Sequence, residues 1–239
     1  MIEARDVSKV FRLPHHRSRS LRRALAWGRS GAEDFHALRG VSLRVETGEF
    51  VGLLGRNGSG KSTLLKIVAG IYPPSSGSVR VDGRIAPILD LGVGFHEMLP
   101  VADNVFLYGV LLGIPRRRLA EDLEAILETA GIARFRDARL ELLSTGMRMR
   151  LAFTVALRAD APVLLIDEAL AVGDENFRER CLAELGALRE RGRTALVVSH
   201  DNAILEALCH RLVVLQDGAV QGQGKAAAMI ALYRSLPKQ

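Results

Sequence analysis

Continuous apolar runs alternate with helical repeats along most of the chain. Residues 49–55 (EFVGLLG) have the pattern of a buried strand that ends at a glycine, and residues 62–70 (STLLKIVAG) that of a helix closed by Gly70. The runs PVLLIDE and TALVVSH have the unbroken hydrophobicity of strands buried on both faces, as in a parallel sheet. We therefore predict an α/β fold whose core sheet is covered on both sides.

Two segments between these runs have other patterns. Residues 71–85 (IYPPSSGSVRVDGRI) combine a Pro/Ser/Gly turn with short alternating stretches, which predicts an antiparallel hairpin and hence an antiparallel β subdomain. From about residue 103 to 158 the pattern is helical, with Pro115 in a first turn. One helical face there is apolar: Leu119, Leu123, Ile126, Leu127 and Ala130. We expect one domain over 1–239, with a helical subdomain at about 95–158.

Composition limits the class of protein. The 239 residues are 48% hydrophobic and 25% charged, which predicts a folded chain with one sizeable core. We see neither the apolar segment of a signal peptide nor a run long enough to cross a bilayer, and expect a cytosolic chain. Cys181 and Cys209 lack metal-ligand spacing and are predicted to be small buried residues.

The net charge is concentrated in one segment. The chain has 33 basic and 27 acidic residues, and residues 12–32 contain six arginines and no Asp, Glu or Lys. Without these six arginines the count is 27 against 27, so this basic insertion carries the whole net charge of +6. It predicts contact with a polyanionic or headgroup-rich surface, or else a solvated loop.

The segment GRNGSGKST fits the pattern G-x-x-x-x-G-K-[ST] between a strand and a helix. Glycines in such a loop let backbone amides surround phosphate groups, the lysine can reach the β and γ phosphates, and the serine hydroxyl can bind Mg²⁺. This predicts a nucleoside triphosphate site. Its candidate residues are Gly55, Asn57, Gly58, Ser59, Gly60, Lys61, Ser62 and Thr63.

Three polar residues follow the two later buried runs. Asp167 ends PVLLID, where its carboxylate can hold Mg²⁺ together with Ser62, and Glu168 comes next, placed to orient an attacking water. His200 ends the other run and can hydrogen-bond the γ-phosphate or help place the water. Alternatively, the carboxylates cap a helix and the histidine is structural.

A further anion site is predicted in LLSTGMRMRLAF. Ser144 has the side chain of an N-cap, Gly146 permits close approach of a ligand, and the first amides of the following helix have no partners within it. On its own, this pattern is also that of an ordinary capped helix.

With these motifs in order, the chain resembles the ATP-binding cassette family, the nucleotide-binding subunits of ABC transporters. The resemblance implies a P-loop NTPase core sheet, hydrolysis of ATP with Mg²⁺, and a homodimer. LSTGM (143–147) occupies the place of the LSGGQ signature, which implies that Ser144 and Gly146 cover ATP held by the partner subunit. It also implies that Asp174 crosses the dimer and that Phe11 stacks on adenine, although Phe11 could instead be a core residue.

The sequence departs from the family pattern at several positions. Thr145 and Met147 replace the usual Gly and Gln of the signature. The glutamine expected near residues 90–92 is absent from LDLGVGF, where Asp90 is the available polar residue. The segment that contains it, residues 87–114, and STGMRMRLAF are similar to those of polysaccharide-exporting cassettes, which move lipid-linked O-antigen, capsule or teichoic polymers.

The resemblance implies an ATPase that powers export of a lipid-linked polysaccharide through a separate transmembrane permease. It would act peripherally on the cytoplasmic face of the cell membrane. An import or efflux cassette with another cargo is an alternative. A nucleic-acid-associated ATPase, with the arginine segment as its binding element, is another, but the single cassette and the exporter-like segment speak against nucleic acid.

Overall fold

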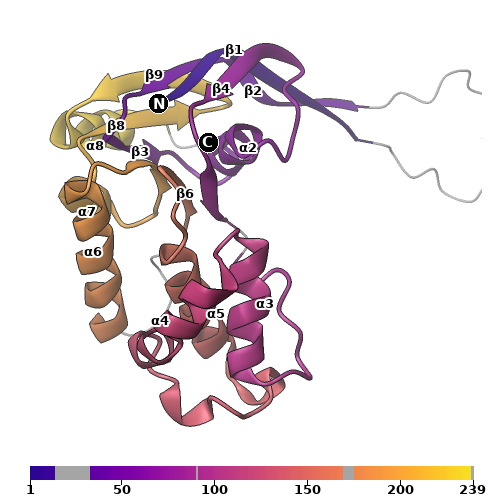
Figure 1. The fold of residues 1–239 in the computed structure, drawn as a ribbon. Helices are drawn as coiled ribbons and strands as arrows, with labels where there is room; N and C mark the ends of the chain where they lie inside the picture. The colour runs from indigo at the N-terminus through magenta and orange to yellow at the C-terminus, as the bar shows by residue number, and fades with distance from the viewer. Residues whose placement is uncertain (14–32, 90, 169–174, 238–239) are drawn as a thin grey trace, which may run out of the picture.

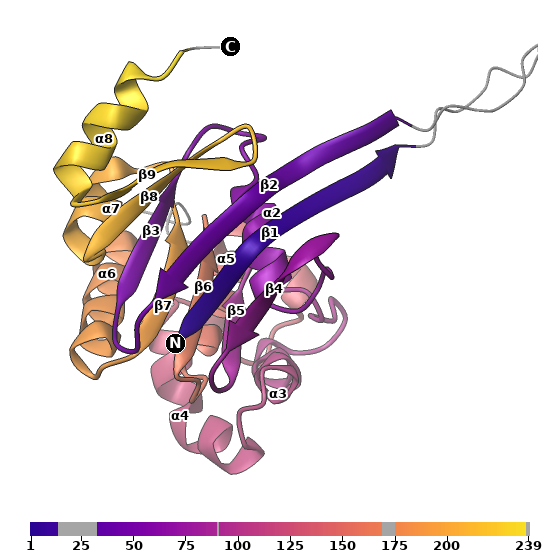
Figure 2. The same ribbon diagram turned by 90° about the horizontal axis from the view of Figure 1, so that it is seen from above.

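The chain forms two sheets with helices between and around them (Figure 1). The computed structural model describes residues 1–13, 33–89, 91–168 and 175–237. The smaller sheet is antiparallel, in the order β2-β1-β4. Its strands are β1 (Ile2–Leu13), β2 (Glu33–Val45) and β4 (Ser76–Val81). The paired ends of β1 and β2 extend away from the other elements (Figure 2).

The larger sheet has the order β5-β6-β7-β3-β8-β9. Its first five strands pair in parallel, and β9 pairs with β8 antiparallel. The strands are β3 (Phe50–Leu54), β5 (Ile85–Ile88), β6 (Val163–Asp167), β7 (Thr194–Val198), β8 (Arg211–Gln216) and β9 (Ala219–Gly224). All residues of β3 and β7 are buried, as expected for strands covered on both faces.

The helices divide between the two faces of this sheet. Three of them lie together at one end of the molecule in Figure 1: α3 (Val101–Leu111), α4 (Arg116–Thr129) and α5 (Thr145–Leu157). The others are α2 (Lys61–Val68), α6 (Glu175–Glu190), α7 (Asn202–Leu208) and α8 (Ala226–Ser235). Two short 3₁₀ turns, Ala133–Phe135 and Leu140–Leu142, lead from α4 towards α5.

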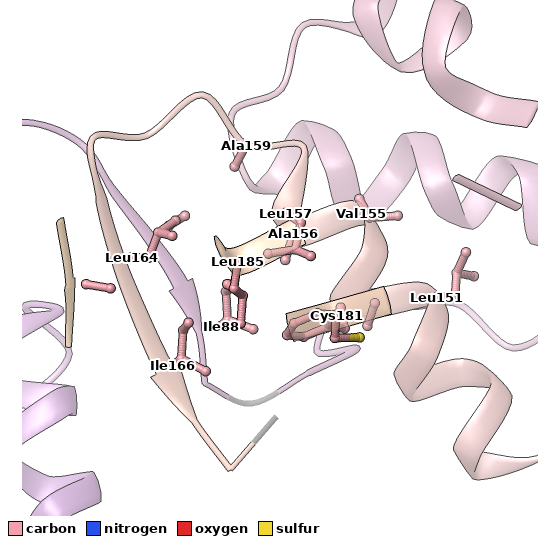
Figure 3. Packing of buried hydrophobic residues seen from close by; sticks show 14 of the residues in the cluster. Ile88, Leu151, Val155, Ala156, Leu157, Ala159, Leu164, Ile166, Cys181 and Leu185 are labelled. Atoms are coloured by element: carbon pink, nitrogen blue, oxygen red, sulfur yellow. The ribbon is translucent and has the colours of Figure 1, made fainter. Parts of the chain in front are cut away.

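Two buried clusters hold these layers together. One lies between the sheets, where Leu64 and Leu65 of α2 meet Val41 of β2 and Leu53 of β3. The other joins the large sheet to the helical layer, and Figure 3 shows Ile88, Leu164 and Ile166 of the strands with side chains of α5 and α6. Each fully buried aliphatic side chain stabilises the fold by about 1.5–3 kcal/mol, so α2 and α5 are held firmly at the sheet.

The predicted antiparallel hairpin at 71–85 is wrong. Strand β4 pairs with β1 in the small sheet, and β5 pairs in parallel with β6 in the large sheet. The turn between them therefore carries the chain from one sheet to the other. Gly83 in this turn has a φ of 100°, and a Cβ there would lie 2.6 Å from Pro162 Cγ, so the turn favours glycine. The alternation of apolar and polar residues predicted where both strands lie but not which strands they pair with.

The predicted buried strands and the helix after the first of them are confirmed, whereas Pro115, predicted in a first turn, is the N-cap of α4. Strands β3, β6 and β7 and helix α2 lie where the apolar runs placed them, and Gly70 follows α2 with a φ of 76°. The five residues predicted on one face of α4 and its end are buried. No helix in the described ranges is long and apolar enough to span a bilayer. Both cysteines are buried, and burial raises the pKa of each thiol to about 12.

Candidate nucleotide-binding site

The phosphate loop connects β3 to α2, and its shape depends on glycine. A Cβ at Gly55 would lie 2.3 Å from the Leu215 carbonyl oxygen, and one at Gly60 would lie 2.7 Å from the Ala37 carbonyl oxygen. Gly60 also has a φ of 102°, which disfavours other residues. By contrast, a Cβ at Gly58 would meet no described atom within 4 Å. The first two glycines permit packing against the chain, and Gly58 leaves open space above the loop.

Lys61 begins α2 and is buried beneath this loop. Its Nζ donates to the carbonyl oxygens of Gly55, at 2.7 Å, and Arg56, at 2.8 Å. Burial lowers the pKa of the Lys61 ammonium, while Glu168 and Asp167 act to raise it. The N-terminus of α2 has no side-chain cap, so its first amides are available to an anion.

Asp167 lies at the carboxyl end of β6, opposite Ser62. Burial raises the pKa of its carboxyl group, a hydrogen bond from the Ser62 hydroxyl opposes that rise, and the charge of Glu168 adds to it. Asp167 Oδ1 is buried without a hydrogen-bond partner among the described residues. A buried, unpaired carboxylate oxygen beside a hydroxyl is a donor set that Mg²⁺ would satisfy.

Glu168 and His200 form the second half of the site. Glu168 has a left-handed φ of 52°, and its amide donates to the Val198 carbonyl oxygen at 3.0 Å. Its carboxylate Oε1 lies 2.6 Å from His200 Nε2, and both side chains are about half exposed. A left-handed glutamate costs about 1–3 kcal/mol, a strain found mostly at functional sites.

Glu168 joins two cavities. The first, of 260 Å³, lies over the phosphate loop. Its lining is Phe35, Ala37, Asn57, Gly58, Gly60, Lys61, Ser62, Thr63 and Glu168. The second, of 450 Å³, is lined by residues that include His200, Ser199 and Arg178. The glutamate therefore lies between the phosphate loop and the histidine, where a water attacking a terminal phosphate could be oriented.

The aromatic residue that lines the phosphate-loop cavity is Phe35, not Phe11. Phe35 is 48% exposed and lies in β2 directly opposite Phe11 of β1. Phe11 is partly buried, packs edge-on against Tyr72 at 5.6 Å between ring centres, and has Lys9 Nζ 5.1 Å from its own ring centre. Sequence motifs did not single out Phe35, since only the pairing of β1 with β2 relates it to Phe11.

Ser144 is the N-cap of α5, as predicted. Its Oγ accepts a hydrogen bond from the Met147 amide at 3.3 Å. A Cβ added to Gly146 would meet nothing within 4 Å in the described chain, so its own fold does not require glycine there. Neither residue lines the two cavities at Glu168. The turn is an open helix N-terminus that is separate from the phosphate loop of its own chain.

Comparison with known families decides the classification. The model of the ABC transporter family matches residues 38–171, which include the phosphate loop, Ser144 and Glu168. The chain belongs to the ABC transporter family.

Several relatives of this cassette have names that refer to polymer export. It is 41% identical over 198 residues to the O-antigen export system ATP-binding protein RfbB of Myxococcus xanthus, covering 83% of this chain and 45% of that protein. Against an RfbB of Klebsiella pneumoniae it is 35% identical, covering 98% and 97%. The teichoic acids export ATP-binding protein TagH of Levilactobacillus brevis is 32% identical, covering 99% and 65%. The cassette thus spans about half of one relative and nearly all of another.

Solved structures support the fold. A dimeric ATP-binding cassette in a post-hydrolysis state, bound to ADP and Pi, has a TM-score of 0.77 and 25% identity. The match covers 95% of this chain and 99% of that one. Two residues singled out in the sequence, Asp174 and Asp90, lie outside the described residues of the cassette, as does most of the basic insertion at 12–32.

Proposed function

We propose that this cassette hydrolyses ATP with Mg²⁺ and powers export of a lipid-linked polysaccharide through a separate transmembrane permease. The observation that carries the chemistry is the convergence of Lys61, Asp167 and the Glu168–His200 pair around one phosphate loop. The export assignment is supported by relatives named for O-antigen and teichoic acid export.

Each side chain has a role that follows from its position. Lys61 and the amides of the loop and α2 bind the β and γ phosphates. Ser62 and Asp167 would hold Mg²⁺, which supplies neutralisation of phosphate charge when bound. Glu168 orients the attacking water, and the His200 imidazole holds that carboxylate in place and contributes a hydrogen bond towards the γ-phosphate.

The signature turn, Ser144 to Gly146, acts in the partner subunit's site. Ser144 and Gly146 present an open helix N-terminus that their own phosphate loop does not use. In a head-to-tail homodimer each turn would cover the γ-phosphate of ATP held by the other chain, with Asp174 crossing the interface. A solved relative of similar fold is dimeric with ADP and Pi.

An exposed apolar surface supports a membrane partner. Val93, Leu107, Val110 and Leu111 are between 37% and 68% exposed. They are contiguous at least in part, because a Cβ on Gly94 would lie 2.6 Å from Leu111 Cδ1. Clustered exposed apolar side chains of this kind mark a protein interface. A permease docked there would hold the cassette at the cytoplasmic face of the membrane.

The test of this function measures polysaccharide export in cells that depend on this gene. Glu168→Gln should abolish surface polysaccharide while lipid-linked polymer accumulates inside, although the protein still binds ATP. Lys61→Ala should give the same cellular phenotype but bind ATP weakly. Normal surface polymer with a Glu168→Gln protein that no longer hydrolyses ATP would refute the export function, and nucleic-acid binding by the purified protein would favour the competing class.

A further inference from the structure

Arg148 of α5 has three acceptors that all lie beside the signature turn. Its Nε donates to the Leu143 carbonyl oxygen at 3.0 Å and one terminal nitrogen donates to that of Glu141 at 3.0 Å. The other terminal nitrogen donates to Glu97 Oε1 at 2.8 Å. The side chain is only 28% exposed. Since Leu143 directly precedes Ser144, Arg148 fixes the backbone that enters the turn.

Glu97 belongs to a loop, residues 96–100, that is itself held rigidly. The wholly buried Asn104 accepts from the His96 amide at 2.7 Å and donates to the carbonyl oxygens of His96, Leu99 and Pro100. This loop also pairs with the chain leading to the turn, through Leu140 N to Leu99 O and Glu141 N to Glu97 O, both 3.0 Å. The loop and the approach to the signature turn therefore form one hydrogen-bonded unit.

The same loop presents apolar side chains outwards. Met98 is 52% exposed and Leu99 37%, and Leu142 on the other side of the pairing is 68% exposed. A partner bound to this surface would contact the loop whose Glu97 side chain is hydrogen-bonded to Arg148.

We propose that Arg148 is a positioning residue for ATP turnover, which couples the exposed loop 96–100 to the signature turn. This inference rests on the proposed function, in which Ser144 covers the partner subunit's nucleotide. Within the described residues, Ser144 Oγ makes one 3.3 Å hydrogen bond to the helix, and a Cβ on Gly146 would meet no atom within 4 Å, so the contacts of Arg148 are a main side-chain support of the turn. A planar guanidinium can serve three acceptors in fixed directions, and a lysine ammonium cannot match that fork.

The first test is steady-state kinetics of the purified cassette. Arg148→Ala should lower kcat by about 10-fold to 100-fold, the loss expected when an active group is misplaced by about 1 Å. KM and the Kd for a fluorescent ATP analogue should not change, because the phosphate loop of the variant chain is intact. Arg148→Lys should recover only part of kcat. An unchanged kcat in Arg148→Ala, or a loss of ATP affinity equal to the loss of kcat, would overturn the proposal.

Arg193 is the matched control. It is also 28% exposed and pairs with Asp160 at 2.6 Å, away from the turn. Arg193→Ala should keep wild-type kcat. A drop equal to that of Arg148→Ala would assign the effect to general loss of an ion pair and contradict the proposal.

A double-mutant cycle tests the connection to the loop. Glu97→Gln alone should lower kcat about two- to fivefold, as for one partly exposed ion pair. In the Arg148→Ala background it should have no further effect, since the two residues act through one contact. Fully additive losses would show that loop 96–100 does not act through Arg148.

Mixed dimers locate the defect in one half-site. Arg148→Ala mixed with Lys61→Ala should regain activity, because one site of the heterodimer combines an intact phosphate loop with an intact signature turn. Arg148→Ala mixed with Ser144→Arg should not, since both damage the same half. If Ser144→Arg complements Lys61→Ala but Arg148→Ala does not, the Arg148 inference alone fails. If neither complements, the shared site of the proposed function fails.

Discussion

Two neighbouring phenylalanines, Phe11 and Phe35, are the candidates for stacking on the adenine ring of ATP. Phe35 lines the phosphate-loop cavity, whereas Phe11 packs on Tyr72. Phe35→Ala should weaken ATP binding about 5-fold to 150-fold, equivalent to loss of about 1–3 kcal/mol of base stacking. Phe11→Ala should weaken it less. Titration with a fluorescent ATP analogue measures both, and a larger effect of Phe11→Ala would support the assignment of Phe11 made from the sequence and contradict that of Phe35.

Residues in contiguous motifs could be predicted from the sequence, and Phe35 could not. The phosphate loop and the pair Asp167–Glu168 are each defined by a few adjacent residues whose geometry follows from one strand and one turn. The place of Phe35 depends on the register between β1 and β2, which are separated by the basic insertion. The contact between His200 and Glu168 likewise depends on β6 and β7 being neighbours.

At the scale of elements, Asn104 links α3 to the loop before it. Its four hydrogen bonds satisfy backbone groups of His96, Leu99 and Pro100. Asn104→Ala would leave the His96 amide without its acceptor and remove one donor from each of the three carbonyl oxygens, so the free energy of unfolding should fall by about 2–4 kcal/mol. Asp103→Ala, an exposed neighbour in the first turn of α3, should cost less than about 1 kcal/mol. Urea denaturation compares them, and equal costs would contradict this role of Asn104.

Helices and strands with a clear pattern of apolar residues were predicted well from the sequence, and the pairing partners of the strands were not. The apolar face of α4 and the buried runs of β3, β6 and β7 specify both type and location, because burial on one or two faces requires those patterns. Strands β4 and β5 are short and only partly buried, and neither pattern states which sheet each joins. Their partners β1 and β6 are remote in sequence, as is Pro162, which packs closely against Gly83 in the turn between them.

At the scale of the molecule, the basic insertion remains a prediction from sequence. Its arginines, with Leu21, Leu25 and Trp27, are typical of a segment at an anionic membrane surface, where each arginine contributes about 1 kcal/mol. Changing Arg17, Arg19, Arg22 and Arg23 to Gln should leave ATP binding by the isolated cassette unaltered and reduce polymer export in cells. Unchanged export with normal assembly of the complex would contradict a role at the membrane surface. That result is the one expected if the insertion is a solvated loop.

The proposed homodimer would use both of the predicted anion sites of one chain. The phosphate loop and the signature turn do not share a cavity within the described chain, and each has open space for a ligand. Burial of two ATP molecules between two chains would use both, with each nucleotide held by the loop of one and the turn of the other.

The most direct measurement is the mass of Glu168→Gln in solution with and without ATP and Mg²⁺. In this variant the phosphate loop stays intact while the attacking water loses the carboxylate that orients it. Bound ATP should therefore remain unhydrolysed, and the mass from light scattering should double. Adding Ser144→Arg to the same protein should prevent doubling by filling the anion site, while ATP still binds. A Glu168→Gln protein that binds ATP and remains a monomer, or one that hydrolyses ATP at the wild-type rate, would contradict the account.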